Sequence, residues 1–209
     1  MTVYDVRIGY DIDDVLTRTS ELVIEGVNFK LGTDYTLDDF VNPVIEDCFG
    51  LTTEEVNEIF SKPGNKRFPD DLAPFEGAKD VVNSYHGLVD SQYFITARDP
   101  SFREATIRWF DDNGFLYDPR NISFKGVVGE FSLDNTAERK AQTVKDLGIV
   151  FFVEDSLTNA NAISEHADIP VCLLEYPSNK GARHSNVVPV KSWVEVEREL
   201  LRVLEPFKK

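Results

Sequence analysis

The chain has 209 residues, of which 42% are hydrophobic and 28% are charged, as in globular proteins with one substantial core or a core that carries a smaller insertion. Its formal net charge of -15 argues against a nucleic acid polymer or an anionic membrane as the main partner, because both require a basic surface. No signal-peptide pattern or membrane-length apolar run is visible, and Cys48 and Cys172 have no metal-binding spacing, so we expect a cytoplasmic protein with reduced, buried or half-buried thiols.

The first predicted strand, Val6 to Ile12, runs into a cluster of carboxylates at Asp11, Asp13 and Asp14. Three carboxylates so close to a core strand repel one another and lose hydration, which a cation would compensate. Mg²⁺ prefers oxygen ligands, and Asp11 and Asp13 face the same side of a strand, with the Ile12 carbonyl as a further possible ligand. An acidic turn, with Asp13 and Asp14 solvated or capping a helix, is the alternative that this motif alone leaves open.

The next part of the chain, residues 19–75, predicts helices only, over residues 20–30, 34–50 and 52–62. Thr52 and Glu55 form a capping-box pattern at the start of the third helix. A proline-rich stretch then returns the chain to a part in which helices and strands alternate. We therefore predict a helical insertion over residues 19–75 in a core domain made of residues 1–18 and 76–209.

From residue 76 on, helices and strands alternate. Helices are predicted over residues 77–86, 100–113 and 134–147 and from Ser156, and strands over residues 91–96, 121–124, 149–153 and 169–174, the last strand of the chain. A C-terminal helix capped by Ser192 is predicted to place all its main apolar residues in the core: Val194, Val196, Leu200, Leu201 and Leu204. Alternation of this kind predicts an α/β fold with a Rossmann-like, doubly wound parallel sheet, which binds ligands at the carboxyl ends of its strands.

Polar motifs stand at those strand ends. They are D-I-D-D-V-L-T from Asp11, F-I-T-A-R with Thr96, E-R-K-A-Q with Lys140, and F-F-V-E-D-S-L-T-N-A with Glu154 and Asp155. In this order and spacing, the set resembles the motifs of phosphatases of the haloacid dehalogenase superfamily along the whole chain. The resemblance implies a Rossmann-like core with an inserted helical cap, and a phosphatase activity.

The resemblance also implies roles for the first and last motifs. Asp11 is expected to be the nucleophile that forms an aspartyl phosphate, and Asp13 the general acid and then the base. Crowding by neighbouring carboxylates predicts a raised pKa for Asp13, partly opposed by a metal ion. Asp11, Asp155 and the Ile12 carbonyl are the expected Mg²⁺ ligands, with Asp13 contributing at most its backbone.

The middle motifs are expected to bind the phosphate. The resemblance assigns this role to the Thr96 hydroxyl, the Ala97 amide and Lys140, while Arg98 could contact substrate or form a salt bridge within its loop. Lys125 competes with Lys140, which we favour because its distance along the chain from Asp155 suits the family. The roles of Asp14 and Glu154 stay open.

The helical insertion and two short motifs, P-F-E-G-A and Y-P-S-N-K, resemble the 5'-nucleotidase type C group that includes the 5'(3')-deoxyribonucleotidases. This implies a Mg²⁺-dependent phosphomonoester hydrolase (a phosphatase) for a nucleotide, such as a nucleoside monophosphate, or for another small phosphorylated metabolite. Of the aromatic residues of the cap, we expect at most one or two to touch substrate and most to form its own core: Phe29, Tyr35, Phe40, Phe49 and Phe60. A phosphotransferase or mutase, or a regulatory protein that binds metal or phosphate without turnover, are the alternatives.

Overall fold

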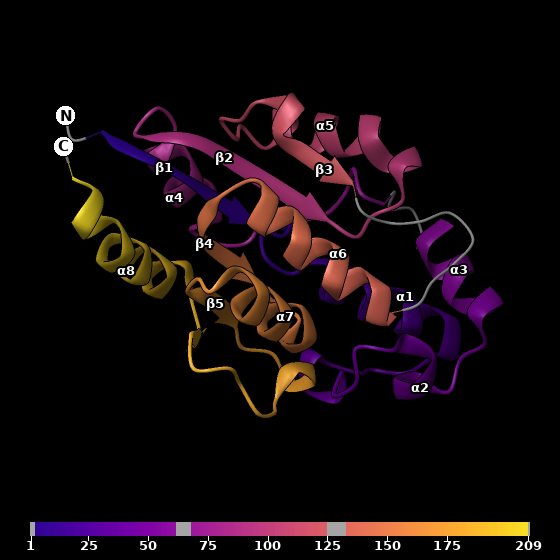
Figure 1. The fold of residues 1–209 in the computed structure, drawn as a ribbon. Helices are drawn as coiled ribbons and strands as arrows, with labels where there is room; N and C mark the ends of the chain where they lie inside the picture. The colour runs from indigo at the N-terminus through magenta and orange to yellow at the C-terminus, as the bar shows by residue number, and fades with distance from the viewer. Residues whose placement is uncertain (1–2, 62–67, 125–132, 209) are drawn as a thin grey trace.

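A single parallel sheet forms the centre of the molecule. The structure is a computed structural model that describes residues 3–61, 68–124 and 133–208. The strands of this described part are β1 (Tyr4–Tyr10), β2 (Val89–Thr96), β3 (Ile122–Phe124), β4 (Ile149–Glu154), β5 (Val171–Leu174) and β6 (Val187–Val190). They are ordered β3-β2-β1-β4-β5-β6, and every neighbouring pair is parallel (Figure 1). The predicted doubly wound fold is confirmed, and its strand order reverses between β1 and β4, where such folds place ligands.

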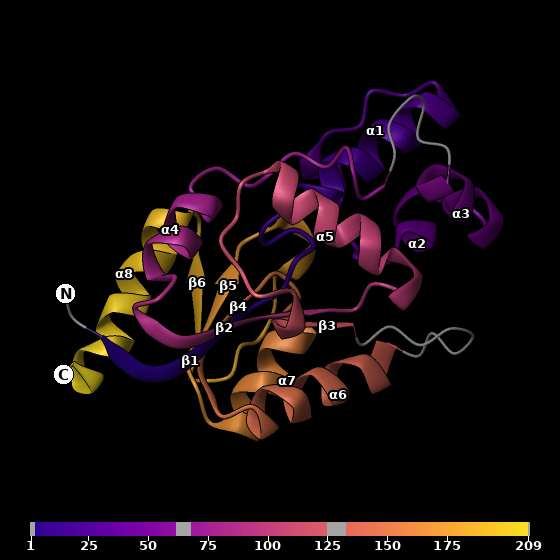
Figure 2. The ribbon, with the colours of Figure 1, turned by 90° about the horizontal axis from the view of Figure 1, so that it is seen from above.

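Helices cover both faces of the sheet, as Figure 2 shows. One face carries α6 (Leu133–Asp146) and α7 (Leu157–Ala167); the other carries α4 (Ala78–Tyr85), α5 (Arg103–Asp112) and α8 (Trp193–Leu204). Each face has its own buried cluster, and the strands between them are apolar on both sides, as β4 illustrates with the sequence IVFFVE. The helices on the two faces therefore hold the ends of the strands in place.

The Phe152 side chain of β4 packs directly over Gly9 of β1. A Cβ atom added to Gly9 would lie 2.6 Å from Cδ2 of Phe152, closer than real side chains come. Glycine at this position therefore lets the large Phe152 ring fill the core beside β1. This packing supports the strand that leads directly into Asp11.

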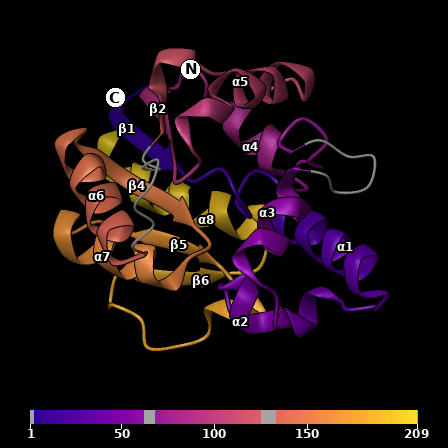
Figure 3. The same ribbon diagram turned by 90° about the vertical axis from the view of Figure 1, so that its right-hand side faces the viewer.

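The remaining helices lie together beyond the carboxyl ends of the strands (Figure 3). They are α1 (Thr19–Leu31), α2 (Ile45–Phe49) and α3 (Thr53–Ser61). They share a separate buried cluster: Val23, Ile24, Val27, Phe40, Phe49, Leu51, Val56 and Ile59. The predicted capping box of α3 is confirmed, since the Glu55 amide donates to the Thr52 hydroxyl (3.2 Å) and the Thr52 amide donates to the Glu55 carboxylate (2.9 Å).

Two expectations about elements are wrong, both because of proline. The helix predicted over residues 34–50 is interrupted: a short 3-10 helix, η1 (Leu37–Asp39), precedes α2. Pro43 lies between them, has no amide hydrogen to donate, and disfavours helical geometry in the residue before it. Strand β6 was not predicted because it contains Pro189, which an edge strand tolerates.

The expected core face of α8 is too wide. Val196, Leu200 and Leu204 are fully buried, but Val194 is 68% and Leu201 is 47% exposed. An α-helix has 3.6 residues per turn, so these two residues, which are seven apart, lie on the same outer face. The prediction of core contacts is therefore wrong for Val194 and Leu201.

The remaining composition-based expectations concern thiols and membranes. Cys172 is buried, Cys48 is half-buried, and both are free. Among the helices that the structure describes, none has the length and apolar character needed to cross a bilayer.

Candidate active site

The predicted site residues converge at the carboxyl edge of the sheet. Asp11 directly follows β1, Thr96 ends β2, and Glu154 ends β4 with Asp155 next to it. The Asp11 amide donates a hydrogen bond to the carbonyl of Val153 (2.9 Å), so the β1–β4 ladder continues to the first carboxylate. Parallel pairing thus brings residues from distant parts of the chain to one place.

Lys140 reaches this edge from α6 and connects two carboxylates. Its Nζ atom lies 2.8 Å from Oδ1 of Asp11 and 2.8 Å from Oε2 of Glu154, and the side chain is only 1% exposed. Burial alone would lower the pKa of Lys140, but the two carboxylates raise it above its ordinary value. Lys140 is therefore a buried cation against Asp11, while its competitor Lys125 lies outside the described residues.

Glu154 positions this lysine. Besides Lys140, its carboxylate accepts hydrogen bonds from the Ser156 amide and the Asn159 side-chain amide, both at 3.2 Å. Both donors belong to the start of α7, where a negative charge is favourable. The role left open for Glu154 is thus to hold Lys140 against Asp11.

Asp13 is held by an arginine. Nε and Nη2 of Arg98 each donate to one carboxylate oxygen of Asp13 at 2.8 Å, and the Thr19 hydroxyl donates to it at 2.6 Å. Burial opposes ionisation, but the charge and hydrogen bonds of Arg98, with the Thr19 hydrogen bond, lower the pKa of Asp13 below its ordinary value. The expectation of a raised pKa for Asp13 is wrong, because Arg98 and the Thr19 hydroxyl outweigh the effect of burial.

The other phosphate-binding candidates surround this pair. The Thr96 hydroxyl accepts a hydrogen bond from the Arg98 amide (3.1 Å) and lies 3.5 Å from Asp13 as a weak donor. Ala97 follows β2 and is half-buried. Arg98 forms its salt bridge with Asp13, outside its own loop, so its guanidinium is directed at a protein carboxylate.

The Ile12 carbonyl is not free for a metal ion. It accepts hydrogen bonds from the Leu16 amide (2.9 Å), the Thr17 amide (3.1 Å) and the Thr17 hydroxyl (3.1 Å). The chain turns tightly after β1 and closes onto this carbonyl. The ligand role of Ile12 stays a prediction, and these hydrogen bonds count against it.

Asp14 binds the first turn of the helix that follows. It has a left-handed backbone (φ 53°), and its carboxylate accepts from the amide (2.8 Å) and the hydroxyl (2.6 Å) of Ser20, in the first turn of α1. Burial raises the pKa of Asp14 to about 7. The Asp14 carboxylate thus satisfies a backbone donor in the first turn of α1, although Arg18 occupies the N-cap position.

Three carboxylates could hold a metal ion. One oxygen from each of Asp11, Glu154 and Asp155 lies within 4.8 Å of the others. Both Glu154 oxygens already accept hydrogen bonds, so Asp11 and Asp155 are the better metal ligands. Burial raises the pKa of Asp11 to about 7 and that of Asp155 well above its ordinary value, an unfavourable arrangement that a divalent cation would relieve. Such an oxygen-rich set fits a hard cation such as Mg²⁺.

A turn late in the chain packs against this candidate metal site, and sequence reasoning missed its contacts. The Asn179 side-chain amide donates to the carbonyls of Asp155 and Leu174, both at 2.6 Å. The Tyr176 hydroxyl donates to the carbonyl of Asp14 (2.9 Å). The Y-P-S-N-K motif was noted only as a resemblance, since its contacts depend on a fold that brings β5 beside β4.

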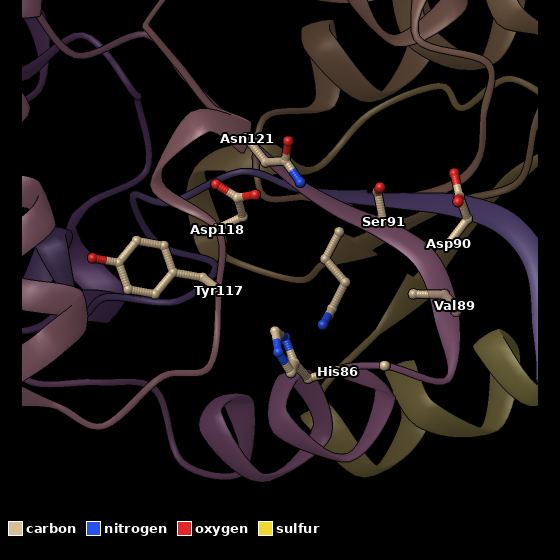
Figure 4. Close-up of a pocket in the computed structure, with 9 residues that line it drawn as sticks. His86, Val89, Asp90, Ser91, Tyr117, Asp118 and Asn121 are labelled. Atoms are coloured by element: carbon tan, nitrogen blue, oxygen red, sulfur yellow. The ribbon is translucent and has the colours of Figure 1, made fainter. Parts of the chain in front are cut away.

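A separate pocket lies away from these residues. It has a volume of about 280 Å³ and is formed where β2 begins, beside the end of α4 and the turn at residues 117–121 (Figure 4). Its carboxylates are already paired, Asp90 with Arg7 at 3.1 Å and Asp118 with Arg120 at 2.6 Å. We therefore assign the candidate active site to the opposite end of the strands.

The chain is similar to known proteins in sequence and in structure. No family model matches the chain. It is 26% identical over 192 residues to the Bacillus subtilis protein named "Putative nucleotidase YqfW", covering 91% of each chain. Its structure is similar to a predicted phosphoglycolate phosphatase from Haemophilus somnus, with a TM-score of 0.62, 12% identity, and 96% and 99% of the two chains covered.

A second similar structure contains a phosphate. It is a haloacid dehalogenase-family hydrolase from Deinococcus radiodurans with bound phosphate and sodium, with a TM-score of 0.57, 16% identity, and 96% of each chain covered. Hydrolases of the same superfamily from other bacteria also match over almost the whole chain. The protein therefore has the fold of the haloacid dehalogenase superfamily of hydrolases, as its motifs predicted.

Proposed function

We propose that the protein is a Mg²⁺-dependent phosphomonoester hydrolase that acts through an aspartyl phosphate on Asp11. The observation that carries this proposal is the buried contact between Lys140 and Asp11, at the sheet edge where Asp155 also lies. A carboxylate next to a buried lysine and a second carboxylate is suited to receive a phosphoryl group, whose charge those neighbours compensate.

In the first step, an Asp11 oxygen attacks phosphorus and the ester P–O bond breaks, while the leaving oxygen takes a proton from Asp13. In the second, water attacks phosphorus, the Asp11–phosphorus bond breaks, and the water proton passes to Asp13. The proton that Asp13 loses in the first step is thus regained in the second. Lys140, fixed by Glu154, orients Asp11 and stabilises the negative phosphoryl oxygens.

The metal would be held by the carboxylates of Asp11 and Asp155. Because the Ile12 carbonyl already accepts hydrogen bonds, the backbone carbonyl of Asp13 is the proposed third ligand. Bound Mg²⁺ supplies positive charge that polarises the phosphoryl group. The Thr96 hydroxyl and the Ala97 amide are the proposed neutral donors to the phosphate.

Residues 19–75 are the proposed cap. Their helices lie beyond the carboxyl ends of the strands, where they would limit access of water to the site (Figure 3). Phe60 of α3 contacts Phe68 (ring centroids 5.3 Å apart), and Phe68 contacts Phe102 (5.1 Å), so aromatic rings connect α3 to the turn before α5. These rings and the nucleotidase names of similar proteins support a nucleoside monophosphate as substrate, in the cytoplasm that the composition predicts.

Phosphate release tests the proposal. Nucleoside monophosphates and sugar phosphates would be incubated with wild type and Asp11→Asn, with Mg²⁺ and with chelator. The exposed Asp112→Asn serves as the matched control for a lost carboxylate. We expect Mg²⁺-dependent release by wild type and Asp112→Asn only, fastest with nucleotides.

Two other results would contradict the proposal. Transfer of the phosphoryl group to an added alcohol in preference to water would identify a phosphotransferase. Mg²⁺ binding by folded protein without turnover of any ester would identify a regulatory protein.

A further inference from the structure

Arg98 is a buried arginine whose guanidinium grips the Asp13 carboxylate. Nε donates to one oxygen and Nη2 to the other, both at 2.8 Å, and the Arg98 side chain is 2% exposed. This two-point contact fixes both the position and the rotation of the carboxylate. Asp13 therefore has a defined orientation before any substrate arrives.

Arg98 is itself anchored on its other sides. Nη1 donates to the hydroxyl of Thr106 in α5 (3.1 Å), and the ring of Phe68 lies over the guanidinium, 5.1 Å from centroid to Cζ. Thr106 is fully buried, so this anchor is part of the rigid core. The guanidinium is thus positioned by α5 and by the segment that follows the helical region.

Both proposed steps use the Asp13 carboxylate, so its orientation matters to each. The two-point contact with Arg98 sets that orientation. In the second step the attacking water must lie against Asp13 as well as phosphorus. The orientation that Arg98 enforces therefore matters when the aspartyl phosphate is hydrolysed.

We infer that Arg98 is a positioning residue for phosphoenzyme hydrolysis: it holds the Asp13 carboxylate where it can accept the proton of the attacking water. In this step the water oxygen bonds to phosphorus, the Asp11–phosphorus bond breaks, and phosphate leaves while the water proton moves to Asp13. The inference rests on the proposed phosphatase function. It differs from both roles that the sequence suggested for Arg98, contact with substrate and a salt bridge within its own loop.

Separating the two steps tests this role. With p-nitrophenyl phosphate, the leaving group departs readily without a proton, so nitrophenol release in the first turnover reports attack by Asp11. Phosphate release in the steady state reports completion of the second step. Acid quenching and mass measurement of the protein give the fraction that carries one phosphoryl group.

Arg98→Lys keeps the positive charge but cannot donate to both carboxylate oxygens in the same geometry. We expect it to slow steady-state phosphate release by about 10- to 100-fold, the usual effect of misplacing a catalytic group. First-turnover nitrophenol release should stay within about threefold of wild type, because uncatalysed departure of this leaving group hides the loss of an acid. Phosphoenzyme should then accumulate. Thr106→Val, which loosens Arg98 without touching Asp13, should slow the same step less. Arg108→Lys, at an exposed pair with Asp70, is the control and should change neither step.

The outcomes distinguish the alternatives. Equal losses in both steps with a raised KM would show that Arg98 binds substrate and would overturn the inference, as would wild-type kinetics in Arg98→Lys. If Arg98→Lys does not fold, Thr106→Val decides: slowed hydrolysis with phosphoenzyme accumulation supports the role, and unchanged hydrolysis overturns it. Wild type that releases no nitrophenol would instead refute the proposed function itself.

Discussion

Replacing Lys140 by Met is the most informative test of how the site is held together. Methionine retains a flexible apolar stem of similar size, so the packing of α6 against β4 changes little. The ammonium group is lost, and two buried carboxylates keep their places without it. Asp11 and Glu154 have side chains that are only 7% and 1% exposed.

The expected cost follows from this burial. Removing one partner of a buried ion pair typically lowers the free energy of unfolding by about 3–5 kcal/mol. For a chain of this size, 1 kcal/mol corresponds to about 2–4 °C in Tm, so the metal-free variant should melt about 6–20 °C lower. Adding Glu154→Gln to Lys140→Met removes one of the stranded charges and should recover part of the loss.

Thermal unfolding in chelator, followed by circular dichroism, measures these differences. Lys145→Met, on the exposed side of the last turn of α6, is the matched control and should change Tm by less than about 2 °C. Mg²⁺ should restore part of the Tm of Lys140→Met, because the cation replaces a positive charge beside Asp11. A Tm for Lys140→Met within the range of the control would refute the reasoning that Lys140 balances buried charge.

Three further predictions concern pH, the metal-supporting turn and the helix packing. The raised pKa of Asp11, about 7 against 3.8 in the unfolded chain, means that the folded protein binds more protons between these values, so the unfolding free energy of metal-free protein should fall from pH 5 to pH 8. Mg²⁺ should raise Tm more at pH 8 than at pH 5; a larger effect at pH 5 would contradict this. Asn179→Ala removes the hydrogen bond to the Asp155 carbonyl and should weaken Mg²⁺ binding, measured by calorimetry, about 10-fold. Leu204→Ala should cost about 2–5 kcal/mol in urea unfolding and the exposed Leu201→Ala less than about 0.5 kcal/mol; equal costs would contradict the burial pattern of α8.

The sequence predicted which residues gather at the strand ends better than how they contact one another. Asp11, Thr96 and Asp155 could be placed because each follows or ends a strand with a clear apolar pattern, and parallel strands end at one edge. The pairing of Arg98 with Asp13 joins residues 85 apart and depends on side-chain geometry that no pattern encodes. The raised pKa predicted for Asp13 failed for that reason.

Turns and edges were the other limit. The closing of the loop after β1 onto the Ile12 carbonyl depends on backbone geometry over a few residues, which the D-x-D spacing does not specify. Strand β6 pairs on one side only, so it tolerates Pro189 and lacks the continuous apolar signal of β4.

The contacts around the first carboxylates join the two ends of the chain. Lys140 contacts Asp11 across 129 residues, the Tyr176 hydroxyl binds the Asp14 carbonyl across 162, and the Trp193 indole donates to the Val15 carbonyl across 178. Contacts of such long range form slowly, because much of the chain must be ordered before they close. During synthesis the loop after β1 is made before Lys140, Tyr176 and Trp193, so these contacts can form only after much of the chain has been made. Asp11 therefore stays without its lysine partner until residues up to Lys140 have been made, and the loop stays without its Trp193 contact until the last helix is made.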